Sequence, residues 1–168
     1  MPTAFEARVL KSSNRRASAP AIALTAKQKR LIRESFRKLN PALDLVGQLF
    51  FLKLYRLDPA FRDRFSGTSE TQGRKFMAAL KLTIISINYE DGLAPTLKLL
   101  GIRHRQLGIK IRHYRMMSKA LLWTLEQSLE KRFTRETKDA WSALLTQITR
   151  TLSGGDAALL RSVGGTAA

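Results

Sequence analysis

Cysteine is absent from this chain of 168 residues, and histidine occurs only twice, at His104 and His113. The lack of cysteine excludes disulfide scaffolds, thiolate metal sites, iron–sulfur clusters and cysteine nucleophiles. Two histidines cannot form a three-histidine zinc site. No uncharged run reaches the roughly 18 apolar residues that a membrane span needs, and the best candidate, residues 78–87, is short and contains Lys81. The sequence also has no visible repeat and no glycine-rich phosphate loop.

Acidic residues are scarce, since 13 of them face 30 basic residues and give a formal net charge of +17. The excess is concentrated in two places: residues 1–40 hold 10 basic and 2 acidic residues, and residues 101–120 hold 6 basic residues and no acidic one. Such a field attracts polyanions, including nucleic acid and anionic membranes. A charged surface that keeps the protein soluble explains the same numbers. The ordinary apolar fraction of 44% predicts one folded domain.

The two ends of the chain differ in composition from its middle. Residues 1–23 are rich in Ala, Ser, Arg and Pro, which predicts a basic disordered arm. No continuous apolar core of a secretory signal precedes Ala19, so we expect a cytoplasmic protein. Residues 154–168 open with Gly154-Gly155, which predicts a flexible tail. The folded domain is therefore expected to span residues 24–153.

Helical signals fill the stretch between these ends. Thr25 and Gln28 have the spacing of a capping box, and apolar residues recur at helical intervals behind them. No sustained alternation of apolar and polar residues predicts a strand. We therefore predict an all-α fold, whose main helices span residues 41–57, 70–88, 93–104, 112–129 and 134–152.

Five features in a fixed order carry a family resemblance. They are Phe50-Phe51 before Asp58-Pro59, Phe65 at the end of the next turn, Gln72 at the start of a long helix, residues 100–104 (Leu-Gly-Ile-Arg-His), and Glu136 five residues before Trp141. This order resembles the globin family, specifically bacterial single-domain globins and the haem domains of flavohaemoglobins. The resemblance runs from Leu24 to Leu152. It implies the globin fold, helices A to H packed around a pocket for haem b, iron protoporphyrin IX.

The resemblance makes His104 the proximal haem ligand on helix F. A neutral imidazole suits iron and needs a second hydrogen-bonding group to fix its tautomer. Without the surrounding pattern, a single histidine on a short apolar helix is more often a hydrogen-bonded core residue. His113 lies beside Arg112 and Arg115 and is expected to be an exposed residue at the start of a helix.

On the ligand side, the resemblance makes Phe65 the ring that stacks on haem and Gln72 a hydrogen-bond donor to the bound ligand. Ordinary core packing would also explain Phe65, and an exposed position would also explain Gln72. Bacterial relatives commonly have a tyrosine where this chain has Phe51, so we predict weaker oxygen retention than in those relatives. Phe76 stands where a smaller aliphatic residue is usual and is expected to narrow the pocket.

On the opposite side, the resemblance pairs Tyr114 and Glu136 in a catalytic network around the haem-ligating histidine. A carboxylate beside the imidazole would raise its basicity and favour O–O activation. Glu136 is equally typical of an acidic residue in the first turn of a helix. Three basic residues, Arg103, Arg74 and Lys75, are candidates for contact with the haem propionates.

The function implied is reversible binding of O2, NO or CO. The resemblance also implies nitric oxide dioxygenation, which would need a separate reductase as electron source. Two alternatives stay open: a haemless globin-like signalling or interaction module with Phe51 and Phe76 filling the pocket, or a basic surface that binds nucleic acid or anionic membrane. The second would use residues 1–23 and 103–119.

Overall fold

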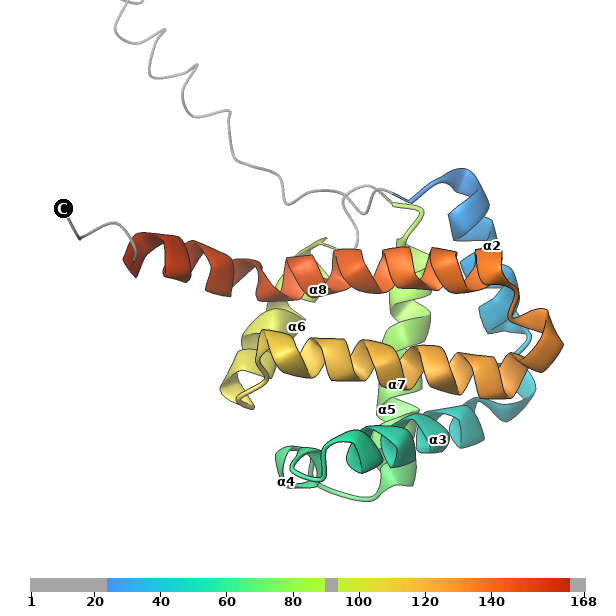
Figure 1. Ribbon diagram of the computed structural model, residues 1–168, viewed down its shortest axis with the longest axis horizontal. Coiled ribbons are helices and arrows are strands. Elements are labelled where there is room, and N and C mark those ends of the chain that lie inside the picture. Colours follow the sequence, from blue (N-terminus) through green and yellow to red (C-terminus); the bar gives the residue numbers. More distant parts are fainter. Residues whose placement is uncertain (1–23, 90–93, 164–168) are drawn as a thin grey trace, which may run out of the picture.

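The computed structural model describes residues 24–89 and 94–163, and in these ranges the chain forms helices, turns and bends without a strand. The predicted arm at residues 1–23 lies outside them. The elements are α2 (Ala26–Arg37), the short 3-10 helix η1 (Asn40–Ala42), α3 (Leu43–Leu57), α4 (Phe61–Arg64), α5 (Ser69–Ser86), α6 (Ala94–Gln106), α7 (Ile111–Leu129), the 3-10 helix η2 (Glu130–Arg132) and α8 (Arg135–Val163). The all-α prediction is confirmed, and Figure 1 shows the arrangement of the helices.

The start of α2 has the predicted capping box. The Thr25 hydroxyl accepts a hydrogen bond from the Gln28 backbone N–H at 3.1 Å, and the Thr25 N–H donates to Gln28 Oε1 at 2.9 Å. Two N–H groups that the first helical turn would leave without partners are thereby satisfied. Thr68 caps α5 in a similar way by accepting from the Thr71 N–H. Both α2 and α5 therefore begin at a residue whose side chain fixes the start.

Helices α3 and α5 cross in direct backbone contact at two glycines. A Cβ atom added to Gly47 would lie 2.6 Å from the Gly73 carbonyl oxygen, and one added to Gly73 would lie 2.5 Å from the Gly47 carbonyl carbon. Any larger residue at either position would push the helices apart. The close crossing brings the side chains of Phe51 and Gln72 to the wall of one cavity.

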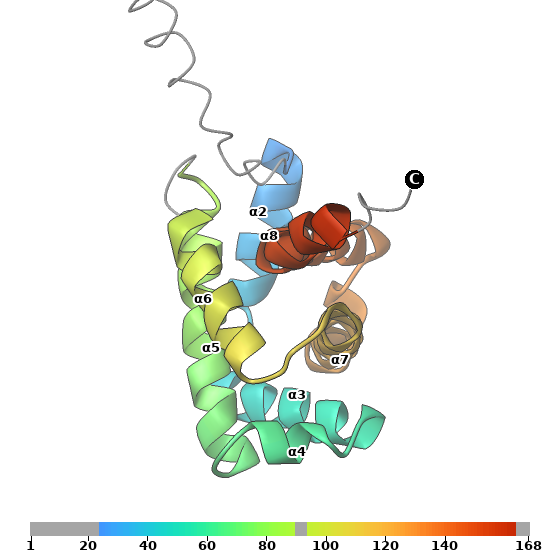
Figure 2. The ribbon, with the colours of Figure 1, turned by 90° about the vertical axis from the view of Figure 1, so that its left-hand side faces the viewer.

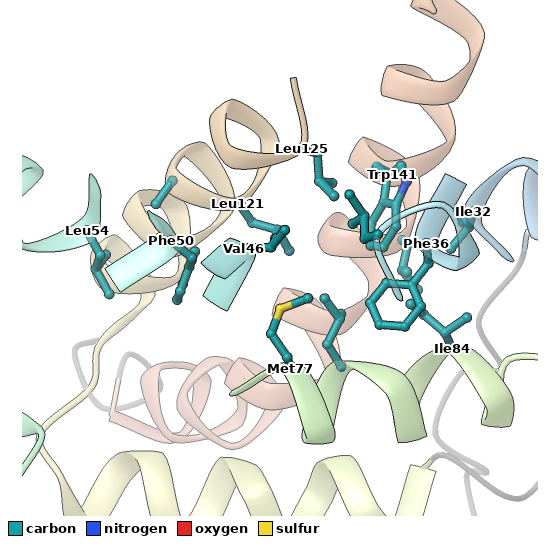
Figure 3. Close-up of a cluster of buried hydrophobic side chains, with 14 of the residues drawn as sticks. Ile32, Phe36, Val46, Phe50, Leu54, Met77, Ile84, Leu121, Leu125 and Trp141 are labelled. Carbon is teal, nitrogen blue, oxygen red and sulfur yellow. The ribbon is translucent and has the colours of Figure 1, made fainter. Parts of the chain in front are cut away.

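The core lies where α2, α3, α5, α7 and α8 meet (Figure 3). Trp141 on α8 is fully buried, and its indole Nε1–H donates to the Ser35 hydroxyl on α2 at 2.9 Å. The surrounding side chains are aliphatic or aromatic, and include Ile32, Phe36, Phe50, Met77, Ile84, Leu121 and Leu125. Because the indole donor is satisfied, its burial carries no cost of an unpaired polar group.

Helices α7 and α8 lie side by side and join through η2 (Figure 1). The sequence pattern predicted that the last helix ends at Leu152 and that a flexible tail begins at Gly154. The structure corrects the helix end, because α8 continues through Gly154-Gly155 to Val163, and the flexible tail stays a prediction. A glycine pair lowers helix propensity by about 1 kcal/mol per residue but does not have to break a helix that Leu152 already anchors in the core.

Helices α5 and α6 form one side of the molecule (Figure 2). Helix α6 packs closely against α8 at Gly101, where an added Cβ atom would lie 2.9 Å from the Leu152 carbonyl oxygen. The face of α6 that points toward α5 and α7 lines the cavity described below. Across the described ranges, no helix combines the length and the apolar character needed to cross a bilayer.

Candidate functional site

A cavity of about 650 Å³ lies between α5 and α6 and is closed by α3, α7 and α8. Its volume is in the range of small-molecule and cofactor pockets. Most of its wall is apolar, and the aliphatic part is contributed by Leu80, Leu97, Leu100, Leu107, Met117, Leu121, Leu145, Ile148 and Leu152. The predicted site residues Phe51, Phe65, Gln72, Lys75, Phe76, Arg103, His104 and Tyr114 all line the same cavity. The fold thus brings together residues spread over more than sixty positions of the sequence.

His104 enters this cavity from α6 and is held by Tyr114 of α7. The Nδ1 atom of His104 lies 3.2 Å from the Tyr114 hydroxyl oxygen. No hydrogen bond involves the other ring nitrogen, Nε2, within the described part of the chain. The tyrosine oxygen is able to accept a proton from Nδ1, and in that tautomer Nε2 offers its lone pair. That is the tautomer that binds a metal through Nε2.

Burial and charge both keep this imidazole neutral. The pKa of His104 is lowered from its usual value, chiefly because burial disfavours the charged ring and further because the Arg103 guanidinium lies nearby. A neutral imidazole is the form that binds metal ions. Side chains of His, Cys, Asp and Glu form no group of three in the described residues, so a metal at His104 would have to bring its other ligands with it, as a porphyrin does.

Glu136 does not take part in this arrangement, which corrects the predicted pairing with Tyr114. Its carboxylate lies on the surface and forms an ion pair with Lys27 of α2, with Oε1 2.6 Å from Nζ. The hydrogen bond to Lys27 lowers the pKa of Glu136. Glu136 follows the start of α8 at Arg135, as the first-turn interpretation implies. The partner of His104 is therefore a neutral hydroxyl, and a carboxylate does not increase the basicity of the ring.

The wall opposite His104 is built from aromatic rings. Phe51 on α3 packs edge-on against Phe65 with ring centroids 5.5 Å apart and against Phe76 at 6.2 Å. Phe76 in turn stacks on Phe50 at 4.1 Å. The rings therefore hold one another in place, and the cavity of about 650 Å³ remains beside them. This observation counts against a pocket that Phe51 and Phe76 fill with their own side chains.

Gln72 provides an amide on this aromatic wall. It is buried in the first turns of α5, and its Nε2 donates to the Ser66 carbonyl oxygen in the segment between α4 and α5. A glutamine amide has two N–H donors, so the bond to Ser66 orients the group and leaves one donor for another partner. The structure thus places Gln72 inside the pocket wall, whereas an exposed helix residue was the alternative.

Basic side chains gather where the cavity opens between α5 and α6. Lys75 and Arg103 line it and are exposed, and neither forms an ion pair with another described residue. Arg74, the third candidate, instead pairs with Asp44 and Glu70. Lys75 and Arg103 are therefore the two cations positioned for anionic groups at the rim of a bound cofactor.

Arg64 also lines the cavity, and sequence reasoning missed it. Its Nη1 donates to the carbonyl oxygens of Leu107 and Gly108, both at 3.1 Å. Gly108 has a φ of 69°, a conformation that favours glycine, and it ends the turn that leads out of α6. Arg64 thereby ties α4 to the turn behind His104. No sequence signal marks it, because its partners are backbone atoms more than forty residues away.

His113 proves to be a buried residue, which corrects the expectation of an exposed one. Only 1% of its surface is accessible. Its Nδ1 accepts the Lys110 backbone N–H at 2.9 Å at the start of α7, and its ring packs edge-on against Phe61 at 5.3 Å. Burial lowers the pKa of His113. It is a helix-capping core residue outside the cavity wall, so the two histidines have different structural roles.

The residues present fit a haem group. A flat apolar cofactor requires a large apolar cavity, a metal needs a neutral imidazole whose ring is oriented, and two carboxylates at the rim need cations. The cavity, His104 with Tyr114, and Lys75 with Arg103 meet these three requirements.

Comparison with known proteins gives the family. The globin family model matches residues 50–152, which is more than half of the chain. Neuroglobin of Tetraodon nigroviridis is 26% identical over 146 residues, which cover 79% of this chain and 92% of that protein. An anaerobic nitrite reductase of Gossypium hirsutum is 26% identical over 140 residues, covering 74% of this chain and 88% of that protein.

A solved structure shows the same fold. The crystal structure of a hexacoordinated heme protein from an anhydrobiotic tardigrade at pH 4 superposes with a TM-score of 0.72 and 21% sequence identity, over 82% of this chain and 98% of that one. The helices therefore follow one another in space as in that protein. This chain belongs to the globin family, and that membership supports haem-based gas binding as its general function.

Proposed function

We propose that this protein is a globin that binds haem b through His104 and reversibly binds O2, NO or CO. The observation that carries the proposal is the His104 ring at the wall of a cavity of about 650 Å³, with Nδ1 engaged by Tyr114 and Nε2 left for a metal. Haem b fits the composition, because the chain has no cysteine that could hold haem through thioether bonds. When bound, the haem iron supplies the coordination position for a diatomic ligand.

The protein contributes the surroundings of that position. Tyr114 fixes the orientation of the His104 ring, and the phenylalanines at 51, 65 and 76 exclude water from the opposite side. Gln72 offers an amide N–H to a ligand that carries partial negative charge. Lys75 and Arg103 neutralise carboxylates at the rim, where exposed ion pairs contribute on the order of 0–1 kcal/mol each.

The visible absorption spectrum of the purified protein, oxidised, reduced and with carbon monoxide, tests this proposal. We expect a Soret band that shifts on reduction and again with carbon monoxide, and an apoprotein that takes up hemin. In His104→Ala the spectrum should lose its imidazole-ligated form, and haem retention should fall.

His113→Asn is the matched control, because the chain has only these two histidines. Asparagine keeps an acceptor for the Lys110 N–H, so α7 stays capped. The spectrum of this variant should equal that of the parent protein. A colourless protein that refuses hemin, or an unchanged spectrum in His104→Ala, would overturn the assignment.

Nitric oxide consumption with a separate reductase is the second candidate function. One observation favours it: the exposed Lys75 and Arg103 at the cavity rim are available to an acidic partner. Mixing NO with the reduced, air-equilibrated protein and measuring nitrate tests it. One nitrate per haem supports this activity. Its absence leaves reversible binding, in line with a neutral tyrosine rather than a carboxylate beside His104.

A further inference from the structure

An apolar stripe runs along the outer surface of α5. Its members are Ala78, Leu82 and Ile85, whose spacing places them on one face of the helix, and Tyr89, which follows in the bend beyond the end of α5. Exposure is 62% for Leu82, 52% for Ile85 and 67% for Tyr89. Single exposed apolar residues are normal, but three at helical spacing share one face of α5, and the exposed Tyr89 follows them. We call this set the α5 stripe.

Basic side chains lie beside the α5 stripe and on the neighbouring helix α6. Lys75 and Lys81 are exposed on α5, and Lys98 and Arg103 are exposed on α6, which lies on the same side of the molecule (Figure 2). None of these four forms an ion pair within the described residues. The one carboxylate on α5, Glu70, is already paired with Arg74. The described surface around the stripe therefore attracts an anionic partner.

We propose that this surface docks reversibly on an anionic lipid bilayer. An apolar stripe flanked by cations is the pattern of a helix that lies in the membrane interface, with lysine stems along the apolar boundary and charged ends at the headgroups. Tyr89, at the end of the stripe, is a residue type that is enriched at the headgroup level of the membrane interface. Docking would be peripheral, since no described helix is able to span a bilayer.

A second copy of the chain fits the α5 stripe less well. Even at the roughly 150–250 Å² that a large aromatic side chain buries, its three large side chains fall short of the roughly 800 Å² per partner of a stable protein interface. Two copies would also bring like charges together, because the chain carries +17 overall. An anionic bilayer needs only a small apolar contact when charge attraction adds to it.

The docked orientation places the cavity rim at the membrane, because Lys75 lies beside the stripe on α5 and lines the cavity together with Arg103. Apolar gases dissolve well in hydrocarbon, so the membrane would act as a local source of ligand. The docking itself does not require haem. The His104→Ala protein is therefore expected to bind vesicles as the parent does, which separates this proposal from the proposed function.

Flotation of the full chain with vesicles tests the docking, using phosphatidylcholine alone and an equal mixture with phosphatidylglycerol. We expect binding to the mixed vesicles that weakens with salt. Leu82→Ser with Ile85→Ser should lower the partition coefficient roughly tenfold, because two inserted side chains are lost. Lys81→Gln should lower it about fivefold.

Matched controls separate docking from adsorption of a highly basic protein. Leu45→Ser with Leu52→Ser removes two leucines of α3 with similar exposure, 68% and 48%, and should leave binding unchanged. Lys131→Gln removes an exposed charge on η2 and should change it less than Lys81→Gln. Equal losses of binding in the two double-serine variants, or no loss in either, would overturn the proposal.

A fluorescence readout identifies the face that meets the lipid. With mixed vesicles, Tyr89→Trp should show a blue-shifted emission relative to its lipid-free state, and Leu45→Trp should not. Light scattering without lipid tests whether a second copy of the chain binds the α5 stripe instead. A concentration-dependent dimer that Leu82→Ser with Ile85→Ser abolishes would replace the membrane by a second copy, and failure to bind anionic vesicles at all would leave the proposal wrong.

Discussion

The two walls of the cavity are built on different principles. On the α6–α7 wall, one polar contact between His104 and Tyr114, 3.2 Å long, fixes a single ring. On the α3–α5 wall, interlocking phenylalanines fix the shape of the cavity, and Gln72 contributes an amide. A directional bond therefore defines the side that we propose to bind the metal, and packing defines the side that we propose to face the ligand.

This difference separates two properties of a gas-binding protein. The orientation and basicity of His104 govern how firmly a metal is held, and a neutral hydroxyl partner makes that imidazole a moderate donor. Retention of a ligand depends on hydrogen bonds offered across the cavity, where Phe51 contributes none. Mutations should therefore separate the two walls. We expect changes on the α3–α5 wall, here called distal, to affect ligand release, and changes on the α6–α7 wall, here called proximal, to affect haem retention.

The largest effect is expected on the distal wall, from Gln72→Met. Methionine has a similar length but no N–H donor, so a ligand with partial negative charge loses its hydrogen bond. Such bonds contribute about 1.5–3 kcal/mol, and we expect oxygen to dissociate roughly ten to a hundred times faster. Stopped-flow dissociation with the reduced protein measures this rate.

Thr83→Val is the control for Gln72→Met. Thr83 lines the same cavity from the same helix, but its hydroxyl already donates to the Ala79 carbonyl at 2.9 Å. Its removal should change oxygen release little. If both variants release oxygen as slowly as the parent, the amide of Gln72 does not face the ligand, and the bond to Ser66 is its only role.

A smaller effect of opposite sign is expected from Phe51→Tyr. The Phe51 ring lines the cavity, so a hydroxyl on it adds a donor on the ligand side. The gain is partly offset because the ring is packed against Phe65 and Phe76, where a polar group without a partner costs free energy. We expect oxygen release roughly three to ten times slower. Unchanged release would mean that the aromatic cluster holds the ring away from the ligand.

Much of this architecture was predictable, because local patterns decide it. The capping box at Thr25 and the helical spacing of apolar residues predicted where helices form, and the order of motifs predicted the globin fold. Local patterns did not predict where α8 ends. Glycines at 154 and 155 favour a break, yet the helix continues from an anchored Leu152 to Val163.

The errors at the site arose where a side chain had two partners to choose from. The sequence allowed Glu136 to contact Tyr114 or to lie on the surface. It lies on the surface, where it pairs with Lys27 of α2, more than a hundred residues earlier in the chain. His113 was predicted to be exposed because arginines flank it, but its ring is buried, accepts the Lys110 N–H and packs against Phe61. Such choices depend on tertiary neighbours, which spacing along the chain does not reveal.

The smallest effects are expected on the proximal wall, where Tyr114→Phe removes the hydroxyl beside His104 and leaves the ring in place. Losing the hydrogen bond to His104 costs about 0.5–1 kcal/mol, so haem should be lost roughly two to five times faster, with oxygen release changed less than in Gln72→Met. Transfer of haem to an acceptor apoprotein measures this.

Glu136→Gln should leave haem loss and the spectrum unchanged, because its carboxylate contacts Lys27 and not the His104 network. Faster haem loss in Glu136→Gln than in Tyr114→Phe would show that the carboxylate reaches the proximal side in solution and that the two walls are not as different as their contacts imply.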